Sequence, residues 1–349
     1  MGLLSDKYNL SCGKRNTFYI VGTIIVIPSF LCIFTAPIWA NFVCRDVWYV
    51  VWPMIFNVGW AAVQVSHMSV LNSLTYCQAK RDQMINSRNG FTYAANIAML
   101  SFSLALFIFE KHSLMQFRVL SITCAVLGSI ASLFYMFHIN EKSLAAEAIS
   151  KEQQFQSMPS HDLSFERSKQ LDWKAWLRMP QFYNCGLIYM SSRVALNVTA
   201  TLMPLYLTRA LGFSGDRQLD TSFAIAAVPL YLYICSMLFS VFCQARVQSR
   251  TPNSRAPLMM IALVITALSS LPMIVLEKED WCKHLIYPCA CLQGISIALM
   301  LNTSTQMISD VIGSNTQSAA FVYGTYSFVD KTINGLFLYW LISSYSMSA

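Results

Sequence analysis

Long apolar runs alternate with short polar segments along the whole chain. Most of the apolar runs contain no Asp, Glu, Lys or Arg at all, and two of them, 179–208 and 311–349, are each interrupted by one charged site. A helix needs about 20 apolar residues to cross the hydrocarbon core of a bilayer, and segments of this length satisfy their backbone in lipid only as helices. The sequence therefore predicts an all-α, polytopic membrane protein with nine spans, at roughly 17–39, 47–71, 91–110, 116–139, 182–207, 222–244, 256–276, 285–308 and 318–344.

Composition and charge placement support this prediction. Hydrophobic residues make up 55% of the 349 and charged residues only 12%, whereas a soluble domain carries about 25% charged residues. If residue 1 is cytoplasmic and the spans alternate, 15 of the 24 Lys and Arg lie inside and 7 outside, with Arg193 and Lys331 within spans. This bias follows the positive-inside rule. The net charge of +7 is thus explained by topology, and we expect no nucleic-acid partner.

The only long connection is the central cytoplasmic loop. It covers residues 140–180 and divides the chain into an N-terminal half of four spans, 1–139, and a C-terminal half of five, 181–349.

The end of that loop reads DWKAWLRMPQFY. Trp173, Trp176 and Leu177 share one helical face beside Lys174 and Arg178, a pattern that predicts a helix lying at the membrane surface. The alternative is an aromatic belt at the start of the next span.

Several motifs carry a family resemblance. In GLLSDKYNLSCGKR (2–15), Gly-x-Leu-x-Asp followed by Gly-Lys-Arg resembles the loop between the second and third spans of major facilitator transporters. FNVGWAAVQVSHMSVL (56–71) resembles the fourth span of their glycoside–pentoside–hexuronide cation symporter group. YMSSRVALNVTATLMPLYLT (189–208) and STQMISDVIGSNTQSAAFVYGTYSFVDKTING (304–335) resemble a vertebrate lysosomal and melanosomal subgroup linked to cysteine import.

This resemblance covers essentially the whole chain and implies a major facilitator fold. The nine spans would be family spans three to eleven, with three to six in the N-terminal half and seven to eleven in the C-terminal half. About three of twelve helices would be absent, and we expect the sequence to be a partial gene model or a shortened isoform. The acidic residues that form much of the cation site in sugar symporters would then precede Met1.

Three ionisable residues lie near the middle of predicted spans: Arg193, Asp330 and Lys331. A charge at this depth costs about 2.5–3.5 kcal/mol on insertion scales, so it usually faces a partner or a water-filled cavity. Asp330 and Lys331 point about 100° apart around their helix. We predict that Asp330 pairs with Arg193 of another helix and that Lys331 points into a central cavity, where the resemblance implies a substrate-site lysine. The alternative is an ion pair that only holds helices together.

Uncharged polar residues complete the candidate substrate-binding set. Asn197 follows Arg193 by four residues and shares its helix face. Asn57 and Gln64, seven apart, share another stripe, and Asn57 matches a position where the sugar symporters place a substrate-binding acid. Ser327 also belongs to the set.

Five further residues are candidates for other tasks. The resemblance implies gating or structural roles for Asp6 in the first motif and for Asp310 and Gly313, placed in an inner loop that repeats it. Arg88 matches a symporter arginine at the start of a span, and a topology-setting role is the alternative. His67 is a candidate proton relay or a structural histidine.

No catalytic motif is present, so we predict a protein that is not an enzyme. We expect a secondary-active, alternating-access transporter of a small polar solute, driven by H⁺ or Na⁺. We expect no cofactor and no metal site, and we expect the protein to be a monomer in the bilayer. The first hypothesis is cysteine or a related amino acid in lysosome-related organelles. The others are sugar–cation symport, or a non-transporting membrane adaptor. Lysosomal or melanosomal membrane is the expected location, with the plasma membrane as the alternative.

Overall fold

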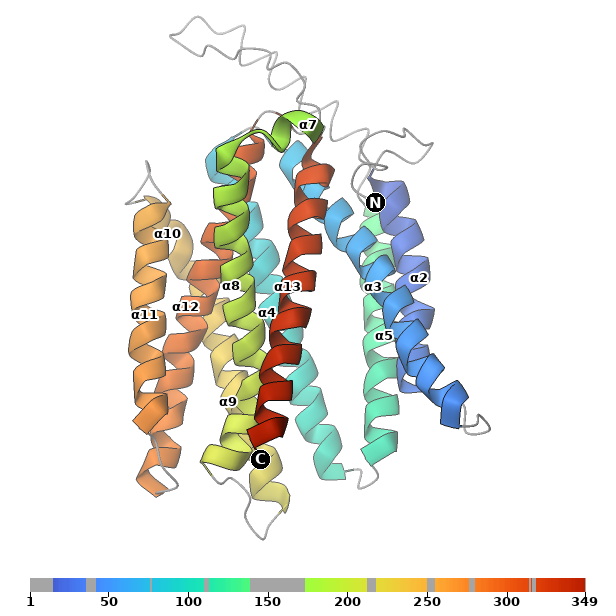
Figure 1. Ribbon diagram of the computed structural model, residues 1–349, viewed down its shortest axis with the longest axis vertical. Coiled ribbons are helices and arrows are strands. Elements are labelled where there is room, and N and C mark those ends of the chain that lie inside the picture. The colour runs from blue at the N-terminus through green and yellow to red at the C-terminus, as the bar shows by residue number, and fades with distance from the viewer. Residues whose placement is uncertain are drawn as a thin grey trace, which may run out of the picture. The chain divides into compact units, whose positions relative to one another are not determined.

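A computed structural model describes most of the chain as helix (Figure 1). The described residues are 15–35, 42–75, 77–109, 113–138, 173–211, 218–249, 255–275, 280–313, 315 and 318–348. Within them nine helices have 19 residues or more: α2 (Asn16–Phe34), α3 (Phe42–Ser73), α4 (Gln78–Phe109), α5 (Ser113–His138), α8 (Pro180–Leu205), α9 (Gln218–Leu238), α11 (Ala256–Val275), α12 (Asp280–Ile312) and α13 (Ala319–Ser348). Shorter elements are α7 (Trp173–Trp176), the π-helices η1 (Tyr206–Ala210) and η2 (Phe239–Cys243), and α10 (Gln244–Ser249).

Each of the nine predicted spans corresponds to one of these long helices. Six of them have the length and apolar composition to cross a membrane: α2, α3, α5, α9 with its extension into α10, α11 and α12. The other three, α4, α8 and α13, have 32, 26 and 30 residues. These three helices carry Arg88, Arg193, Asp330 and Lys331.

Two boundaries differ from prediction in a way that matters for function. α4 begins at Gln78, so that residues 78–90, expected as loop, are helical. α12 continues to Ile312, and Gly313 ends it with a φ of 50°. The prediction that Asp310 lies in a loop is therefore wrong: it lies in the last turn of α12.

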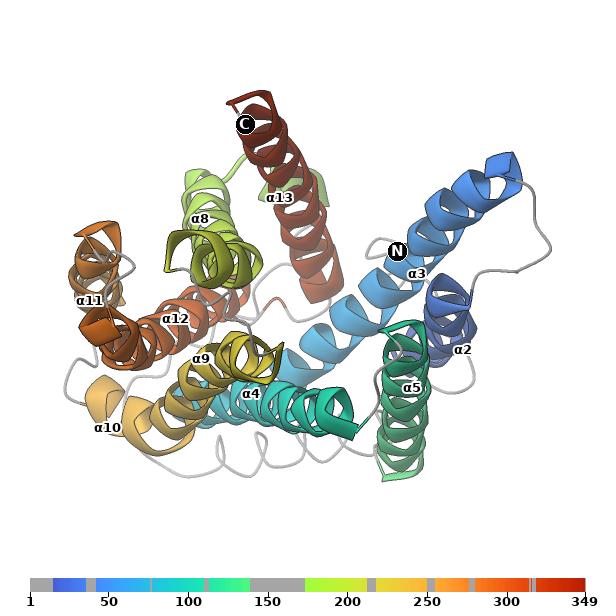
Figure 2. The same cartoon turned by 90° about the horizontal axis from the view of Figure 1, so that it is seen from below.

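One compact unit comprises residues 1–81, 112–182 and 312–328. In it α2 packs against both α3 and α5 (Figures 1 and 2). The α2–α3 contact depends on two glycines, because a Cβ on Gly22 would lie 3.0 Å from the Gly59 carbonyl oxygen, and one on Gly59 would lie 3.0 Å from that of Gly22. Small residues allow this kind of close helix approach in membranes.

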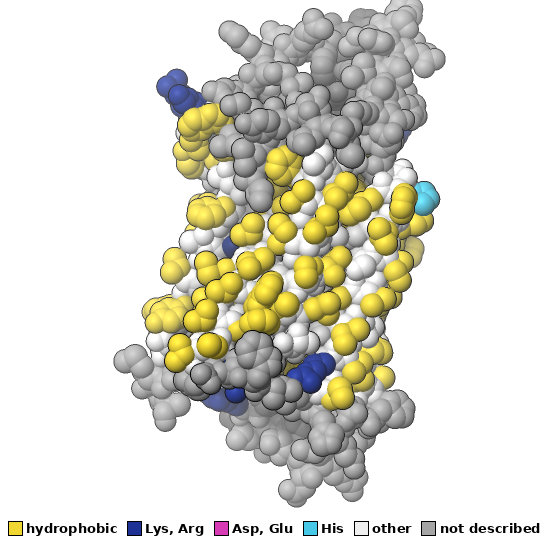
Figure 3. Space-filling model, turned by 90° about the vertical axis from the view of Figure 1, so that its right-hand side faces the viewer, with side chains coloured by type: hydrophobic (Ala, Val, Ile, Leu, Met, Phe, Trp, Pro, Cys, Tyr) yellow, Lys and Arg dark blue, Asp and Glu magenta, His cyan; other side chains and the backbone are white. Residues whose placement is uncertain are grey.

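Seen from the side of α2, α3 and α5, the molecule shows a broad band of hydrophobic side chains, with Lys and Arg mainly toward the two ends (Figure 3). Large exposed apolar residues of these helices include Val21, Ile24, Met54, Ile122, Ile130 and Phe134. A patch this extensive would be a liability in water, and it suits helices that face lipid.

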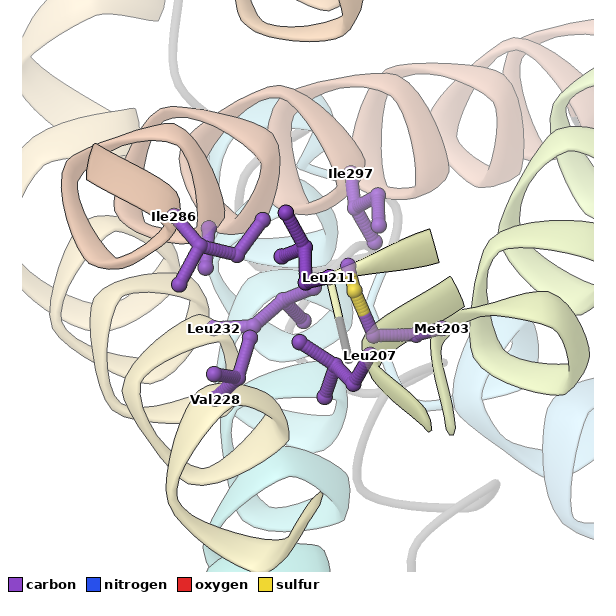
Figure 4. Packing of buried hydrophobic residues seen from close by; sticks show 8 residues of the cluster. Met203, Leu207, Leu211, Val228, Leu232, Ile286 and Ile297 are labelled. Atoms are coloured by element: carbon purple, nitrogen blue, oxygen red, sulfur yellow. The ribbon is translucent and has the colours of Figure 1, made fainter. Parts of the chain in front are cut away.

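The second compact unit comprises residues 82–111, 183–311 and 329–349. Its core joins the end of α8 and η1 to α9 and α12 through Met203, Leu207, Leu211, Val228, Leu232, Ile286, Ala290 and Ile297 (Figure 4). α9 and α12 approach closely, since a Cβ on Gly294 would lie 2.2 Å from the Leu232 carbonyl oxygen. Ser236 donates across the same contact to the Gly294 carbonyl at 2.8 Å.

Segments from both sides of the central loop contribute to each unit. The division into halves at 1–139 and 181–349 stays a prediction.

The end of the central loop differs in part from expectation. Trp173 and Leu177 of the α7 segment are exposed, as a membrane-surface helix requires, but Trp176 is fully buried. Its Nε1 donates to the Ser318 hydroxyl at 2.9 Å, and its ring lies 6.4 Å from that of Phe182. The prediction that all three apolar side chains share the membrane-facing side is therefore wrong for Trp176, which anchors the segment instead.

Candidate functional site

The second unit contains an ion pair between the middles of two helices. Arg193 of α8 donates from Nε to Asp330 Oδ2 of α13 at 3.3 Å, which confirms the predicted pairing. The Asp330 side chain is 4% exposed and that of Arg193 24%. Asn334, one turn along α13, donates from Nδ2 to Asp330 Oδ1 at 2.6 Å and to the Asp330 carbonyl at 2.8 Å. Asp330 thus accepts from two different side chains.

Lys331 follows Asp330 and is only partly covered, but its Nζ is buried. Among the residues that the structure describes, this ammonium has no hydrogen-bond partner. It interacts electrostatically with both Asp330 and Arg193. We call Arg193, Asp330, Lys331 and Asn334 the central cluster.

Three tyrosines and a second arginine surround the Arg193 end of this cluster. Arg193 interacts electrostatically with Tyr189, one turn earlier on α8, and with Tyr93 of α4. The charge of Arg88 also acts on both tyrosines. The Tyr93 ring lies 6.3 Å from that of Tyr233 on α9, and its hydroxyl is buried without a hydrogen-bond partner in the described part of the chain.

The tyrosines were missed in the sequence, although a signal for one of them existed. Tyr189, Arg193 and Asn197 follow one another at four-residue intervals and form one polar stripe on α8. Tyr93 offers no comparable signal, because an aromatic residue inside an apolar helix reads as core.

The remaining candidate substrate residues are divided between the units. Asn197 is half-buried on α8 in the second unit. Asn57, Gln64 and Ser327 belong to the first unit, where Asn57 is exposed and donates to the Pro53 carbonyl of its own helix at 2.9 Å. Ser327 is buried on α13. Their substrate roles stay predictions.

His67, the candidate proton relay, lies on α3 with its ring 5.5 Å from that of Tyr135 on α5. Asp6 lies outside the described residues. Arg88 is the eleventh residue of α4 and donates from Nη1 to the Asn89 amide oxygen at 2.9 Å. Their proposed roles in gating or proton transfer stay predictions.

Asp310 takes part in a second charged group, at the ends of three helices. Arg255, just before α11, donates from Nη2 to Asp82 Oδ2 at 2.7 Å and from Nε to Asp310 Oδ2 at 3.0 Å. Its Nη1 donates to Gln306 at 3.3 Å. Burial lowers the pKa of the Arg255 guanidinium, but the hydrogen bonds and charges of Asp310 and Asp82 outweigh burial and raise it overall. We call Asp82, Arg255 and Asp310 the terminal ion network.

Neutral amides continue from this network along the helices. Gln306 donates to Asn86 at 2.8 Å, Asn86 donates to Gln248 at 3.2 Å, and Gln248 donates back to Gln306. Further along the same helices, Asn89 donates to Asn302 at 2.6 Å.

Asn302 in turn donates to Ser240 at 2.8 Å and to Gln244 at 2.6 Å. Through Asn89 this chain of amides reaches Arg88. It follows from polar residues at four-residue spacing on two helical stretches, Ser240, Gln244 and Gln248 on one and Asn302, Gln306 and Asp310 on the other. Sequence reasoning did not weigh these particular polar residues and overlooked this regular signal.

The chemistry available in the central cluster is ion pairing and hydrogen bonding. Among the described residues there is no group of three or more His, Cys, Asp or Glu side chains that could hold a metal ion. Ion pairing and hydrogen bonding are also the interactions by which proteins hold small polar solutes.

Comparison with known proteins agrees with the fold. The family described as "MFS/sugar transport protein" matches residues 1–346. Major facilitator superfamily domain-containing protein 12 of Equus caballus is 30% identical over 93% of this chain and 68% of its own length, and that of Mus musculus is 30% identical over 96% and 71%. The crystal structure of a bacterial homologue of the iron transporter ferroportin, in an outward-facing state, superposes with a TM-score of 0.54 at 12% identity, over 95% of this chain and 76% of that one.

The low identity to the solved structure supports the fold alone. The family match and the relatives give more than the fold, because they place the chain among membrane transporters rather than enzymes. This confirms the predictions of a multi-pass membrane protein and of a protein that is not an enzyme. With helices that carry buried charges at mid-length and a profile match over nearly its full length, this chain belongs to the MFS/sugar transport protein family of the major facilitator superfamily.

Proposed function

We propose that the protein moves a small polar solute by secondary-active, alternating-access transport, with the central cluster as its binding site. The observation that carries this proposal is the Lys331 ammonium, which is buried at mid-helix without a partner among the described residues, beside a carboxylate already occupied by Arg193. Because an unmatched charge at such depth is costly, a solute that supplies an acceptor is its simplest use. Rocking of two bundles about such a site is the usual mechanism of these folds.

We further propose cysteine or a related amino acid as the solute, carried into lysosomes or melanosomes in symport with H⁺ or Na⁺. The support is the resemblance to a vertebrate subgroup linked to cysteine import, together with the 30% identity to major facilitator superfamily domain-containing protein 12. The plasma membrane is the alternative location.

Sugar–cation symport is the second candidate. The family description, "MFS/sugar transport protein", favours it. Asn57 speaks against strict transfer of sugar recognition, because it has no charge at a position where the resemblance implies an acid.

Uptake into proteoliposomes tests these proposals. Radiolabelled cysteine and a radiolabelled methyl glycoside are compared under an imposed pH gradient and then under a Na⁺ gradient. We expect cysteine uptake in the wild type and at least a ten-fold loss in Lys331→Ala, since a hydrogen bond to a charged group contributes about 1.5–3 kcal/mol.

Lys80→Ala is the matched control, because it removes the same charge from an exposed position at the start of α4. Glycoside uptake without cysteine uptake would favour the second candidate. Wild-type uptake by Lys331→Ala would remove Lys331 from the site.

A further inference from the structure

A cavity of about 220 Å³ lies in the first unit, between α2, α3 and α5. Its walls come from one stretch of each helix, within 23–30 of α2, 56–63 of α3 and 124–132 of α5. An engineered apolar cavity of about 150 Å³ in another protein binds benzene. This cavity therefore has room for a hydrocarbon group larger than a benzene ring.

The walls of the cavity are mainly apolar, and part of them is aromatic. The ring centroid of Phe56 lies 5.7 Å from that of Phe30 and 5.9 Å from that of Trp60. On the α5 side Gly128 contributes only backbone, and a Cβ added there would lie in open space, with no contact within 4 Å. Because apolar cavities stay free of water and take up hydrocarbon, these walls favour a hydrocarbon ligand.

Two hydroxyl groups also line the cavity, and both already have partners in the protein. Thr23 donates to the Tyr19 carbonyl at 2.9 Å, and Ser132 accepts from the Tyr19 hydroxyl at 3.4 Å. None of the described residues in the walls carries a charge. The cavity thus offers little to a polar solute, in contrast to the central cluster.

The cavity is continuous with the lipid-facing surface of the unit, where Figure 3 shows the band of hydrophobic side chains. Trp60 is 47% exposed, and Gly128 is also exposed. Both residues therefore belong to the cavity wall and to the outer surface. A molecule of the bilayer can reach this site without passing through water.

The cavity lies at the depth where the acyl chains of lipids end. α2 has 19 residues, which at 1.5 Å per residue span about 28 Å, close to the hydrocarbon thickness of about 30 Å. The part of α2 that lines the cavity falls within 23–30 and includes residues on both sides of Ile25, the middle of the helix. Chain ends from the two leaflets meet at this level, whereas the edge of the hydrocarbon core is about 15 Å away.

The packing of α5 shows what an occupant would contribute. Among the six helices long and apolar enough to cross a membrane, α5 is the least buried: 6% of its apolar stretch is buried, against 44% for α3. An empty cavity beside α5 forfeits the dispersion contacts that its wall atoms would otherwise make. An occupant therefore supplies contacts that α5 lacks.

We propose that this cavity binds the end of an acyl chain of a bilayer phospholipid, which joins α5 to α2 and α3. A helix of another protein is too wide for it, because a helix with its side chains measures about 10–12 Å across. The inference does not depend on the transport proposal, because the cavity lies in the first unit and includes no residue of the central cluster.

Photo-crosslinking of the purified full chain in phosphatidylcholine nanodiscs tests the inference. One probe lipid carries a diazirine at the end of an acyl chain, and the other carries it next to the head group. We expect the chain-end probe to label peptides that contain 56–63 and 124–132, and the head-group probe to leave them unlabelled. Equal labelling of these peptides by both probes would contradict a chain end in the cavity.

Gly128→Leu places a side chain in the cavity and should remove most of the labelling by the chain-end probe, and Gly128→Ala should remove less of it. The melting temperature of Gly128→Leu in detergent should equal or exceed that of the wild type, because the new Cβ meets open space and Leu favours a helix more than Gly does. Gly335→Leu is the matched control, since a Cβ added at Gly335 of α13 also lies in open space but outside this cavity. It should be labelled like the wild type.

Three results with these proteins would overturn the inference. Unchanged labelling of Gly128→Leu would show that the chain end does not occupy the cavity. Preferential labelling of the same peptides by a diazirine-bearing sterol in mixed nanodiscs would assign the cavity to a sterol. A cross-link between two copies of the chain through 124–132 would assign it to a protein partner.

Discussion

The central cluster and the terminal ion network both lie in the second unit, yet their charges are matched to different degrees. In the terminal network one guanidinium serves two carboxylates and an amide oxygen, and neutral amides extend the hydrogen bonding along α4, α10 and α12. In the central cluster one carboxylate accepts from one guanidinium, and the second cation, Lys331, has no hydrogen-bond partner among the described residues.

We interpret this difference as a structural task for the terminal ion network and, as proposed above, a binding task for the central cluster. In the terminal ion network the charged groups pair with one another and hold helices together, although the amide chain keeps one buried nitrogen, Gln244 Nε2, without a hydrogen-bond partner among the described residues. The central cluster keeps the Lys331 ammonium and the Asn334 amide oxygen without hydrogen-bond partners among the described residues, and a bound solute would complete them. Three changes test that contrast through the stability of the protein in detergent.

The Arg193–Asp330 pair should show the largest effect. Asp330→Asn leaves a buried guanidinium without a counter-charge and should lower the free energy of unfolding by about 3 kcal/mol, as breaking buried pairs typically does. Arg193→Gln should cost a similar amount. The double variant should cost clearly less than the sum of the two, because it removes both charges. Strict additivity in chemical unfolding would show that the two groups are not coupled.

The terminal ion network should come second. Arg255→Ala leaves two carboxylates without their guanidinium, but the Asp82 and Asp310 side chains are 13% and 28% exposed and can regain water. We therefore expect a loss of about 2 kcal/mol in the free energy of unfolding. Arg246→Ala, an exposed position on α10, should change it by less than about 0.5 kcal/mol. An Arg255→Ala protein as stable as the wild type would contradict the structural task.

Lys331 should show the smallest effect on stability, with the opposite sign. Lys331→Met keeps the length of the side chain and removes a charge that has no described partner, so the protein should gain about 1 kcal/mol. The same variant should lose transport. A destabilised Lys331→Met protein would mean that the ammonium has a structural partner and that the contrast between the two charged groups is wrong.

The helices themselves were largely predictable from the sequence. All nine predicted spans correspond to long helices, because a run of about 20 apolar residues in lipid has few other ways to satisfy its backbone. The misplaced boundaries are at polar helix ends, where Gln78 begins α4 and Ile312 ends α12. Hydropathy indicates where a helix enters the lipid, but it does not indicate how many residues the helix continues outside the membrane.

The candidate site was predictable only in part. Arg193 and Asp330 are charged residues within otherwise apolar spans, and the cost of burying them predicts that they find partners. Burying the neutral amides of Asn86, Asn302 and Gln306 costs less free energy than burying a charge, so their positions alone do not predict partners. Tyr93 resembles any buried aromatic residue. Their importance depends on neighbours that are distant in sequence.

By itself, the sequence determined that this protein spans a bilayer and roughly where each helix crosses it. It also determined which buried charges must find partners, because the free-energy cost of placing a residue in lipid depends on its type and on the length of the apolar segment around it. Only the tertiary structure decided which groups meet: Arg255 with Asp82 across 173 positions, and Arg193 with Asp330 across 137. It also decided which groups stay unmatched, because a hydrogen bond depends on the last ångström of packing between helices, and no linear pattern encodes that distance.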